Sequence, residues 1–227
     1  MLITVMSRCL SSTHRINVII AGKQQELQWL NMSGAEEHVR RGASVWNWAS
    51  TSGTEPPDIV LACCGDVPTL ETIAAAAILR ERAPEMKIQV VNVVSLMCLA
   101  TEQEHAAGLP HEAFITLFGE NTPVIFNFHG YPGVIEDILH RRPHPERFYV
   151  KGYREEGTTT TPFDMTVLNG ISRYHVCMEA VEKNQAMPER HKEPLLEMCQ
   201  LKLQQHHAYI REHLEDMPEI RNWEWKY

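Results

Sequence analysis

Hydrophobic residues along this chain follow two patterns, continuous apolar runs and residues spaced three or four positions apart. Continuous runs are typical of strands buried on both faces of a parallel sheet. Spaced residues are typical of helices that cover such a sheet. The alternation of the two predicts an α/β fold with a doubly wound, mostly parallel sheet. The strand runs are 59–64, 88–94, 123–128 and a run that begins at Phe148, and the helix patterns are 66–82, 111–118 and 134–140.

Turn residues mark the margins of this sheet. The aromatic run 45–48 precedes a turn cluster, so we predict an antiparallel edge strand there, which completes a five-stranded sheet. Residues 16–21 are rich in β-branched side chains and predict a strand or extended segment that ends at Gly22-Lys23-Gln24. Because this segment is extended, Lys23 is expected at its carboxyl end.

The stretch from Gly157 to Asp164 contains a run of threonines and is predicted to be a loop that leads into a helix. Thr161 suits the N-cap of that helix, and Pro162 suits its first position. The charge of Asp164 favours the positive end of the helix. Helical spacing continues from there to Val181.

The C-terminal part of the chain begins with a break at 184–188. A long amphipathic helix follows, and the alternating aromatic residues of 223–227 predict an extended tail that docks on the protein. The apolar face of the helix carries Leu196, Cys199, Leu203, Ile210 and Leu214.

These patterns divide the chain into three parts. In the first part, Ser33 and Glu36 form a capping box that opens a short helix, and Gly42 ends the helix. The parts are a linker segment at 1–42 that carries the Gly-Lys-Gln loop, an α/β domain at 43–183, and a C-terminal helix with an aromatic tail at 184–227, packed on the domain.

Composition narrows the classes of function. The formal net charge of -8 argues against binding to nucleic acid or to an anionic membrane, because both need a positive surface. The 6 cysteines show no paired spacing, which favours a reducing, cytoplasmic compartment. No run reaches the roughly 20 apolar residues of a membrane span, and the first residues make a poor signal peptide. We therefore expect a soluble protein.

Two residues are candidates for chemistry at the carboxyl ends of strands. Lys23 follows a glycine and could hold a substrate phosphate, although a solvated lysine fits the same pattern. His129 could act as an acid, a base or a ligand anchor, although such a histidine is more often a structural residue. Together with Lys151 and Thr158 of the threonine loop, His129 could line a crevice that binds a small anion.

Other histidines do not predict a metal site. His140 and His144 have helical spacing, but Pro143 intervenes and breaks the geometry. His206 and His207 are adjacent, so on a helix they point about a hundred degrees apart. No zinc site is predicted.

One motif resembles a cofactor site at first sight. Gly65 and Asp66, followed downstream by Asn92, have the gross spacing of the thiamine diphosphate motif that carries magnesium ligands. Val67 stands where the motif needs a second glycine, and Asn92 lies inside a β-branched run. We therefore expect no cofactor at these residues, and no glycine-rich or Walker loop suggests a nucleotide.

Beyond these patterns, long stretches of the chain resemble the last part of phosphoketolases. The similarity runs in the family's order over nearly the whole chain, which makes it far more specific than a short motif. The stretches are 16–24, 65–72, 90–94, 129–132, 152–157 through 165, 210–213 and 215–221.

The resemblance implies both a fold and an activity. Phosphoketolases use thiamine diphosphate and magnesium to cleave xylulose 5-phosphate, and often fructose 6-phosphate, with inorganic phosphate, giving acetyl phosphate and a shorter aldose phosphate. Like transketolases they have two thiamine-binding domains before a third α/β domain, and they act as homodimers. This chain resembles the third domain, and Lys23 matches the family's lysine that binds the sugar phosphate. The cofactor residues belong to the earlier domains, so the resemblance implies no cofactor site in this chain.

Three hypotheses about function follow. The first is a C-terminal phosphoketolase domain that supports the dimer and the mouth of the active site, is inactive alone, and has the N-terminal and middle domains as its partners. The second is a regulatory module that binds a small anion in the crevice at His129, Lys151 and Thr158. The third is an adaptor that docks onto a separate catalytic chain.

Overall fold

The structure is a computed structural model that describes the chain except residues 14–15, 23–24, 155–156, 158 and 186. Its centre is a five-stranded sheet in the order β1-β3-β2-β4-β5. β1 runs antiparallel to β3, and the remaining neighbours are parallel. This topology confirms the predicted fold class, including the antiparallel edge strand. The strands are β1 (Ala43–Val45), β2 (Ile59–Cys64), β3 (Ile88–Val93), β4 (Val124–Phe128) and β5 (Phe148–Gly152).

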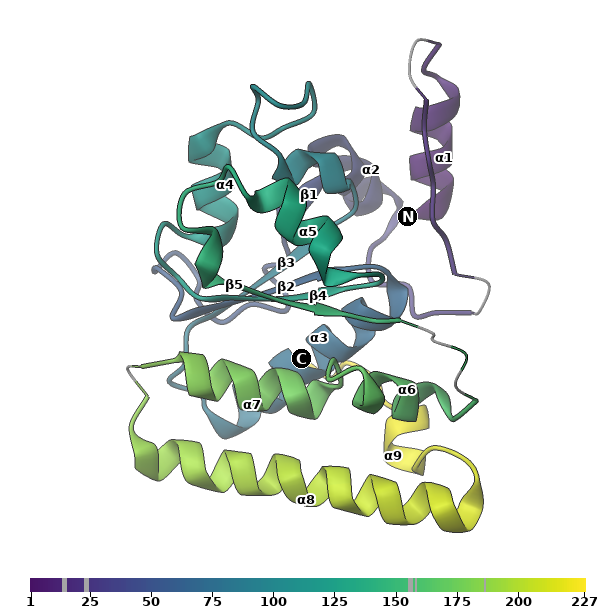
Figure 1. Ribbon diagram of the computed structural model, residues 1–227, viewed down its shortest axis with the longest axis vertical. Coiled ribbons are helices and arrows are strands. Elements are labelled where there is room, and N and C mark those ends of the chain that lie inside the picture. The colour runs from purple at the N-terminus through teal and green to yellow at the C-terminus, as the bar shows by residue number, and fades with distance from the viewer. Residues whose placement is uncertain (14–15, 23–24, 155–156, 158, 186) are drawn as a thin grey trace.

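Helices cover both faces of the sheet (Figure 1). α2, α4 and α5 lie on one face, α3, α6 and α7 lie on the other, and α8 forms a further layer outside α7. α1 stands apart from the sheet beside α2. The α-helices are α1 (Leu2–Leu10), α2 (Met32–Arg41), α3 (Asp66–Arg82), α4 (His111–Phe118), α5 (Pro132–Leu139), α6 (Pro162–Leu168), α7 (Arg173–Lys183), α8 (Glu189–His213) and α9 (Pro218–Arg221), and 3-10 turns span Leu96–Leu99 and Pro145–Arg147.

Alternate residues of the central strands feed two hydrophobic cores. In β2, Ile59 and Leu61 pack into the core shared with α3, α7 and α8, whereas Val60 and Ala62 pack into the core shared with α4 and α5. All four side chains are fully buried. The continuous apolar run is therefore explained by burial on both faces of the strand.

The edge strand is shorter than the sequence predicts. β1 ends at Val45, and Trp46 to Ala49 form a turn in which the amide of Ala49 donates to the carbonyl of Trp46 at 2.9 Å. The hydroxyl of Ser50 then accepts from the amide of Val90 at 3.0 Å, in place of a backbone carbonyl. A side chain thus completes the hydrogen bonding of β3, and the strand predicted at 45–48 is wrong in its position.

The helix predicted from Pro162 to Val181 is divided into α6 and α7. Gly170, with φ +66°, lies in the break. The side chain of Asn169 donates to the carbonyls of Arg154 and Met165 at 3.0 and 2.9 Å and so ties the break to the loop after β5. The helix start was predicted correctly, because the hydroxyl of Thr161 accepts from the amide of Asp164.

Three further differences concern the N-terminal part of the chain. α1 was not predicted, and it buries none of its residues. Residues 16–21 form no strand, which leaves an extended segment as the other structure that the sequence predicts there. The N-cap of α2 is Asn31, not Ser33, because the Asn31 side chain accepts from the amide of Gly34 at 2.9 Å.

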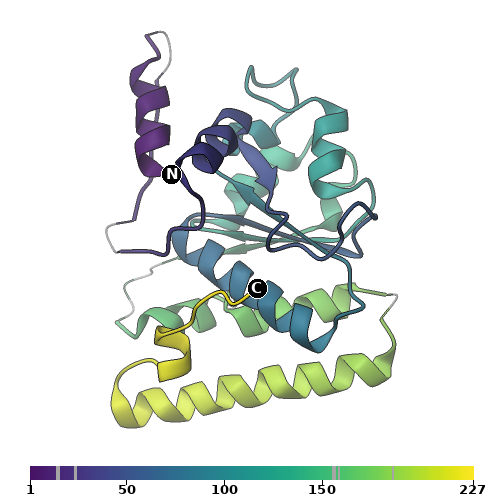
Figure 2. The same ribbon diagram turned by 180° about the vertical axis from the view of Figure 1, so that it is seen from behind.

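The aromatic tail docks on α3, as Figure 2 shows, although it forms no strand. The Trp225 ring meets the Trp48 ring at 5.1 Å in a T-shaped contact, and the Arg80 guanidinium lies 5.5 Å from the centre of the Trp225 ring. Trp29, which follows the Lys23 segment in the sequence, also stacks on Trp48, with the ring centres 6.0 Å apart. The tail and the linker segment therefore share one tryptophan.

A buried ion pair joins α3 to α7. The Arg173 guanidinium donates to both carboxylate oxygens of Glu71, at 3.1 and 2.7 Å, and the Arg173 amide donates to the same carboxylate at 2.7 Å. Both side chains are 3% exposed. Their charges are thus fully paired inside the core.

Among the helices that the structure describes, none is long and apolar enough to cross a bilayer.

Candidate functional site

The strand order places a topological switch point between β2 and β4. The chain passes from β2 to β3 on one side and then crosses to β4 on the other side. In open α/β sheets, ligands bind beyond the carboxyl ends of the two strands that flank such a point. The residues that occupy this position are Gly65 and Asp66 after β2, and His129 after β4.

Asp66 and His129 pair across the switch point. Nδ1 of His129 lies 2.9 Å from Oδ1 of Asp66, and because an ionised carboxylate only accepts, this nitrogen donates. The amide of Val67 donates to the same oxygen at 2.9 Å. The ring of Tyr153 contacts His129 edge-on at 4.9 Å, and the His129 amide donates to the carbonyl of Cys64 at 2.9 Å. The imidazole is thus held with Nδ1 facing Asp66.

The hydrogen bond with His129 lowers the pKa of Asp66 below its ordinary value of 3.8. A carboxylate with a lowered pKa in the folded state adds stability above its ordinary pKa, and this contribution disappears as the pH falls through the lowered value. Asp66→Asn should therefore lower the free energy of unfolding by about 1 kcal/mol at pH 7, with less difference from the wild type in acid. Urea titrations of the wild type and the variant at pH 7 and in acid measure the two free energies of unfolding. An equal difference between the two proteins under both conditions would contradict the prediction.

Gly65 allows the two strand ends to approach closely. Its φ is +103°, which L side chains rarely adopt, and a Cβ atom there would lie 2.4 Å from Cβ of His129. Gly65 is also the N-cap of α3, so Asp66 is the first residue of the helix.

A chain of hydrogen bonds connects Ser44 of β1 to the carbonyl of Gly65. Ser44 donates to Nδ1 of His38 at 2.6 Å, and Nε2 of His38 donates to Oδ1 of Asn92 at 2.8 Å. Nδ2 of Asn92 donates to the hydroxyl of Thr69 at 3.0 Å, and that hydroxyl donates to the carbonyl of Gly65 at 2.5 Å. Burial lowers the pKa of His38, which favours the neutral ring that this direction requires.

The same contacts decide whether the Gly65, Asp66 and Asn92 motif fits the magnesium of thiamine diphosphate. The amide oxygen of Asn92 accepts from His38, and Asn92 is 4% exposed. Oδ1 of Asp66 is engaged by His129 and Val67. Because the oxygen of Asn92 is buried and already bonded, the two residues together do not fit a magnesium ion, which needs a free oxygen atom from each of its ligands. Among the described residues, no group of three or more histidine, cysteine or acidic side chains is placed to hold a metal.

The structure brings Gly22 to the switch point. Gly22 lies against Asp66, since a Cβ atom added to Gly22 would stand 1.9 Å from Oδ2 of that residue. Lys23 and Thr158 lie outside the described residues. The contribution of Asp66 to this site was missed in the sequence, because periodicity does not reveal which loops meet.

The side chains of Lys151 and His129 contact different partners. Its ammonium group pairs with Glu179 of α7 at 3.3 Å. Burial lowers the pKa of His175 on the same helix, and the charge of Lys151 lowers it further. Lys151 thus faces α7, whereas the ring of His129 faces Asp66.

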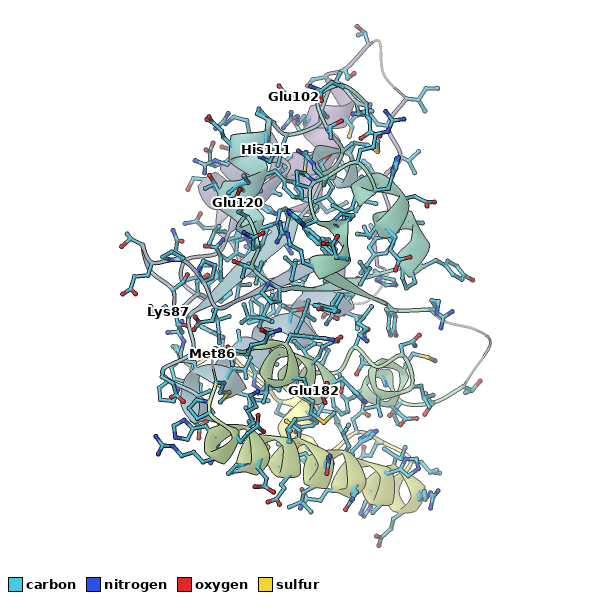
Figure 3. All side chains as sticks on the ribbon, turned by 60° about the vertical axis from the view of Figure 1, so that its left-hand side comes forward. Met86, Lys87, Glu102, His111, Glu120 and Glu182 are labelled. Carbon is cyan, nitrogen blue, oxygen red and sulfur yellow. The ribbon has the colours of Figure 1, made fainter. Side chains whose placement is uncertain are left out.

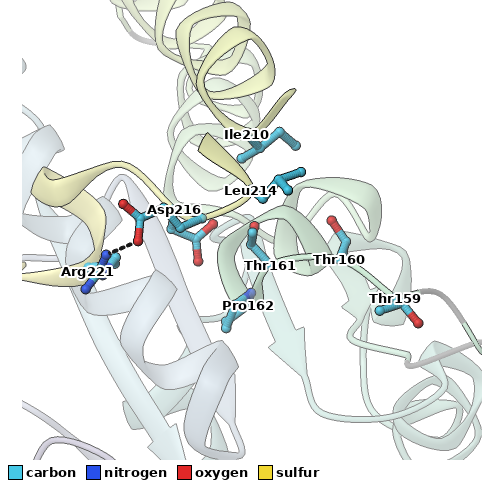
Figure 4. A pocket seen from close by; sticks show the side chains of 9 residues that line it. Thr159, Thr160, Thr161, Pro162, Ile210, Leu214, Asp216 and Arg221 are labelled. Atoms are coloured by element: carbon cyan, nitrogen blue, oxygen red, sulfur yellow. Dashed lines mark hydrogen bonds and ion pairs between the residues drawn. The ribbon is translucent and has the colours of Figure 1, made fainter. Parts of the chain in front are cut away.

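Two cavities lie away from the switch point, among the described residues. The larger has a volume of about 640 Å³ and lies between the threonine loop and the chain that joins α8 to α9 (Figure 4). It is lined by Thr159, Thr160, Thr161, Pro162, Ile210, Leu214, Glu215, Asp216 and Arg221, and an ion pair of 2.6 Å joins Arg221 to Glu215. The smaller, of about 250 Å³, lies beside α4 and is lined in part by His111 and Glu120, which are labelled in Figure 3. Neither cavity includes Asp66 or His129.

Comparison with solved structures defines the class of this domain. A transketolase mutant from Pichia stipitis matches with a TM-score of 0.51 at 13% identity, covering 79% of this chain and 23% of that chain. The chain therefore has a transketolase-like α/β fold, as the sequence resemblance implied.

Comparison of sequences gives the family. The family model described as XFP C-terminal domain matches residues 23–225. A probable phosphoketolase of Brucella abortus is 50% identical over 224 residues, and one of Rhodopirellula baltica is 49% identical over 226 residues. This chain belongs to the XFP C-terminal domain family, which confirms its resemblance to phosphoketolases. Each alignment covers 99% of this chain but only 28% of the relative, so the chain is similar to one part of a larger protein.

Proposed function

We propose that this chain is the C-terminal domain of a phosphoketolase and that its role is to support the dimer and the mouth of the active site. The complete enzyme would use thiamine diphosphate and magnesium to cleave xylulose 5-phosphate or fructose 6-phosphate with inorganic phosphate. The products would be acetyl phosphate and an aldose phosphate, formed in the cytoplasm. The observation that carries this proposal is the 50% identity to a probable phosphoketolase over nearly the whole chain.

Within that enzyme, Lys23 is proposed to bind the phosphate group of the sugar. An ammonium group supplies a charge and three donors to phosphate oxygens. The contact of Gly22 with Asp66 supports this role, because Gly22, which precedes Lys23 in the sequence, lies at the edge of the sheet where ligands bind. Cofactor chemistry would come from other domains, since the Asp66 and Asn92 motif does not fit magnesium.

The supporting role is consistent with the apolar surface near the N-terminus. Ile16, Val18 and Ile20 are 97%, 83% and 81% exposed, and Leu10 is 81% exposed. Contiguous exposed apolar side chains are typical of surfaces that contact another protein. We propose that the preceding domains and a second subunit cover them in the complete enzyme.

A chimeric enzyme tests this proposal. The chain would replace the matching part of the Brucella abortus relative, which is 50% identical. We expect the chimera to form acetyl phosphate from xylulose 5-phosphate and phosphate, measured as the hydroxamate. A folded, dimeric chimera that binds thiamine diphosphate yet forms no acetyl phosphate would contradict the proposal.

A second candidate function is a module that binds a small anion at the switch point. The position of His129 favours it, while the pairing of Lys151 with Glu179 removes one of the cations that it needs. Thermal shift measurements with phosphorylated metabolites and nucleotides test the idea. Stabilisation by one of them would support it, and no stabilisation by any would exclude it.

A further inference from the structure

The segment 16–20 combines apolar side chains with an unpaired backbone. In an extended chain alternate residues lie on one face, so Ile16, Val18 and Ile20 form one apolar strip, and all three are exposed. Among the described residues, the segment makes no backbone–backbone hydrogen bond. It therefore exposes both the β-branched side chains and the polar backbone groups that a strand buries when it joins a sheet.

Helix α1 lies on the other face of this segment. The side chain of Asn17, which alternates with the strip, donates to the carbonyl of Cys9 at 3.3 Å. Ile19, on the same face as Asn17, is 39% exposed, whereas each residue of the strip is at least 81% exposed. Figures 1 and 2 show the segment running beside α1, away from the sheet. The pair thus resembles a strand with a helix packed on one face and the other face left open.

The segment lacks the features that protect a permanently exposed edge. Edge strands in soluble proteins commonly carry charged residues or proline, which discourage pairing with another strand. Residues 16–22 contain no charged residue and no proline. A row of unpaired backbone groups flanked by apolar side chains is a template for strand addition. We therefore expect a second strand to pair with this segment in the complete protein.

The comparisons indicate where that second strand lies. The model of the C-terminal domain family begins at residue 23, whereas the alignment with the Brucella abortus relative covers 99% of this chain. Residues before 23 are thus shared with that relative but lie outside the C-terminal domain. The relative is also much longer, since the alignment covers only 28% of it. Helix α1 and the segment 16–20 therefore fall at the junction with the domain that precedes.

We infer that residues 16–20 form a β-strand in the complete protein by pairing with an open edge of a sheet in the preceding domain, with α1 on one face of the added strand. The inference deepens the proposed function and rests on it for the presence of that domain. It assigns this part of the apolar surface to one partner. Residues 16–20 are then part of an interdomain sheet and not of a linker.

Hydrogen–deuterium exchange of the isolated chain and of the chimera with the Brucella abortus relative tests the inference. In the chimera, the paired amides within 16–20 should exchange about a hundredfold more slowly than in the isolated chain, because only there do they have partners. Residues 59–64 of β2 should be protected in both proteins and report that each is folded. Equal exchange of 16–20 in the two proteins would overturn the inference. So would protection that rises with the concentration of the isolated chain, because it would assign the segment to a second copy.

Proline substitutions distinguish backbone pairing from simple covering by side chains. Alternate amides of a strand point to opposite edges, so Val18→Pro and Ile19→Pro each remove a donor from one edge. In the chimera, at least one of them should bring exchange of 16–20 to within about threefold of the rate in the isolated chain. Val18→Thr and Ile19→Val are the matched controls, because they keep the donor and the β-branched shape, and they should retain the protection.

The inference fails if both proline variants keep 16–20 protected. Loss of protection in 59–64 would mark a variant as unfolded, and the comparison of the wild-type proteins then decides alone. The exchange measurement needs a folded chimera but no activity, so it is independent of the proposed function. An active chimera with 16–20 unprotected would overturn only this inference. A chimera that protects 16–20 but forms no acetyl phosphate would contradict only the proposed function.

Discussion

Replacing Arg173 by methionine is expected to lower the free energy of unfolding by about 3–5 kcal/mol, because it leaves a buried carboxylate without its counter-ion. Arg173 and Glu71 are each 3% exposed, and the carboxylate takes three hydrogen bonds from this one residue. Removing the guanidinium leaves only the bond from the amide. The result should appear in urea or thermal unfolding of the chain.

Two variants separate this effect from a loss of packing. Glu71→Met combined with Arg173→Met should cost less than Arg173→Met alone, because the double change removes both charges. Arg221→Met is the matched surface control: its ion pair with Glu215 is 52% exposed on each side, and its loss should cost less than about 1 kcal/mol. If Arg173→Met and Arg221→Met lowered the free energy of unfolding equally, the buried ion pair would contribute no more to stability than the exposed one.

Replacing Lys23 by methionine in the chimera is expected to raise KM for xylulose 5-phosphate about ten- to hundredfold. A hydrogen bond to a charged group contributes about 1.5–3 kcal/mol, and 1.4 kcal/mol corresponds to a factor of ten. Methionine keeps most of the length of the side chain and removes only the charge and its donors. Steady-state kinetics with varied sugar phosphate measures the effect.

Lys226→Met is the control for this substitution, because Lys226 is an exposed residue of the tail. It should leave KM unchanged. If the Lys23 variant also kept its KM for both xylulose 5-phosphate and fructose 6-phosphate, binding of the sugar phosphate by this residue would be disproved.

Burial on both faces made the strands easy to predict. The run 59–64 is apolar throughout, and 123–128 is apolar except for Asn127, because β2 and β4 each have a neighbour on both edges and helices on both sides. The edge was harder. After Val45 the Ser50 hydroxyl takes over the role of a strand carbonyl, and no pattern of hydrophobic residues signals that exchange.

The helix that follows the threonine loop was predicted correctly at its start and less well in its interior. Thr161 and Pro162 are local signals, and the structure has the helix start where they predict it. The break at Gly170 falls within a stretch that keeps helical spacing, and it is stabilised by the Asn169 side chain bonding to the carbonyl of Arg154. Such a contact depends on a strand end elsewhere in the chain, so spacing alone does not predict it.

The candidate site was predicted only in part for the same reason. His129 was placed at the carboxyl end of its strand from local sequence, but its partner Asp66 lies 63 residues away. The two meet because β2 and β4 are neighbours, which requires the strand order. Lys151 was expected beside His129, and the structure shows it paired with Glu179. The role of Lys23 came from family resemblance and remains a prediction.

The central claim is that this chain supports an active site whose chemistry needs other domains. The most direct test is to incubate the purified chain, alone and in the chimera, with thiamine diphosphate, magnesium, xylulose 5-phosphate and phosphate. We predict acetyl phosphate from the chimera and none from the chain alone. Acetyl phosphate formed by the isolated chain would contradict the claim.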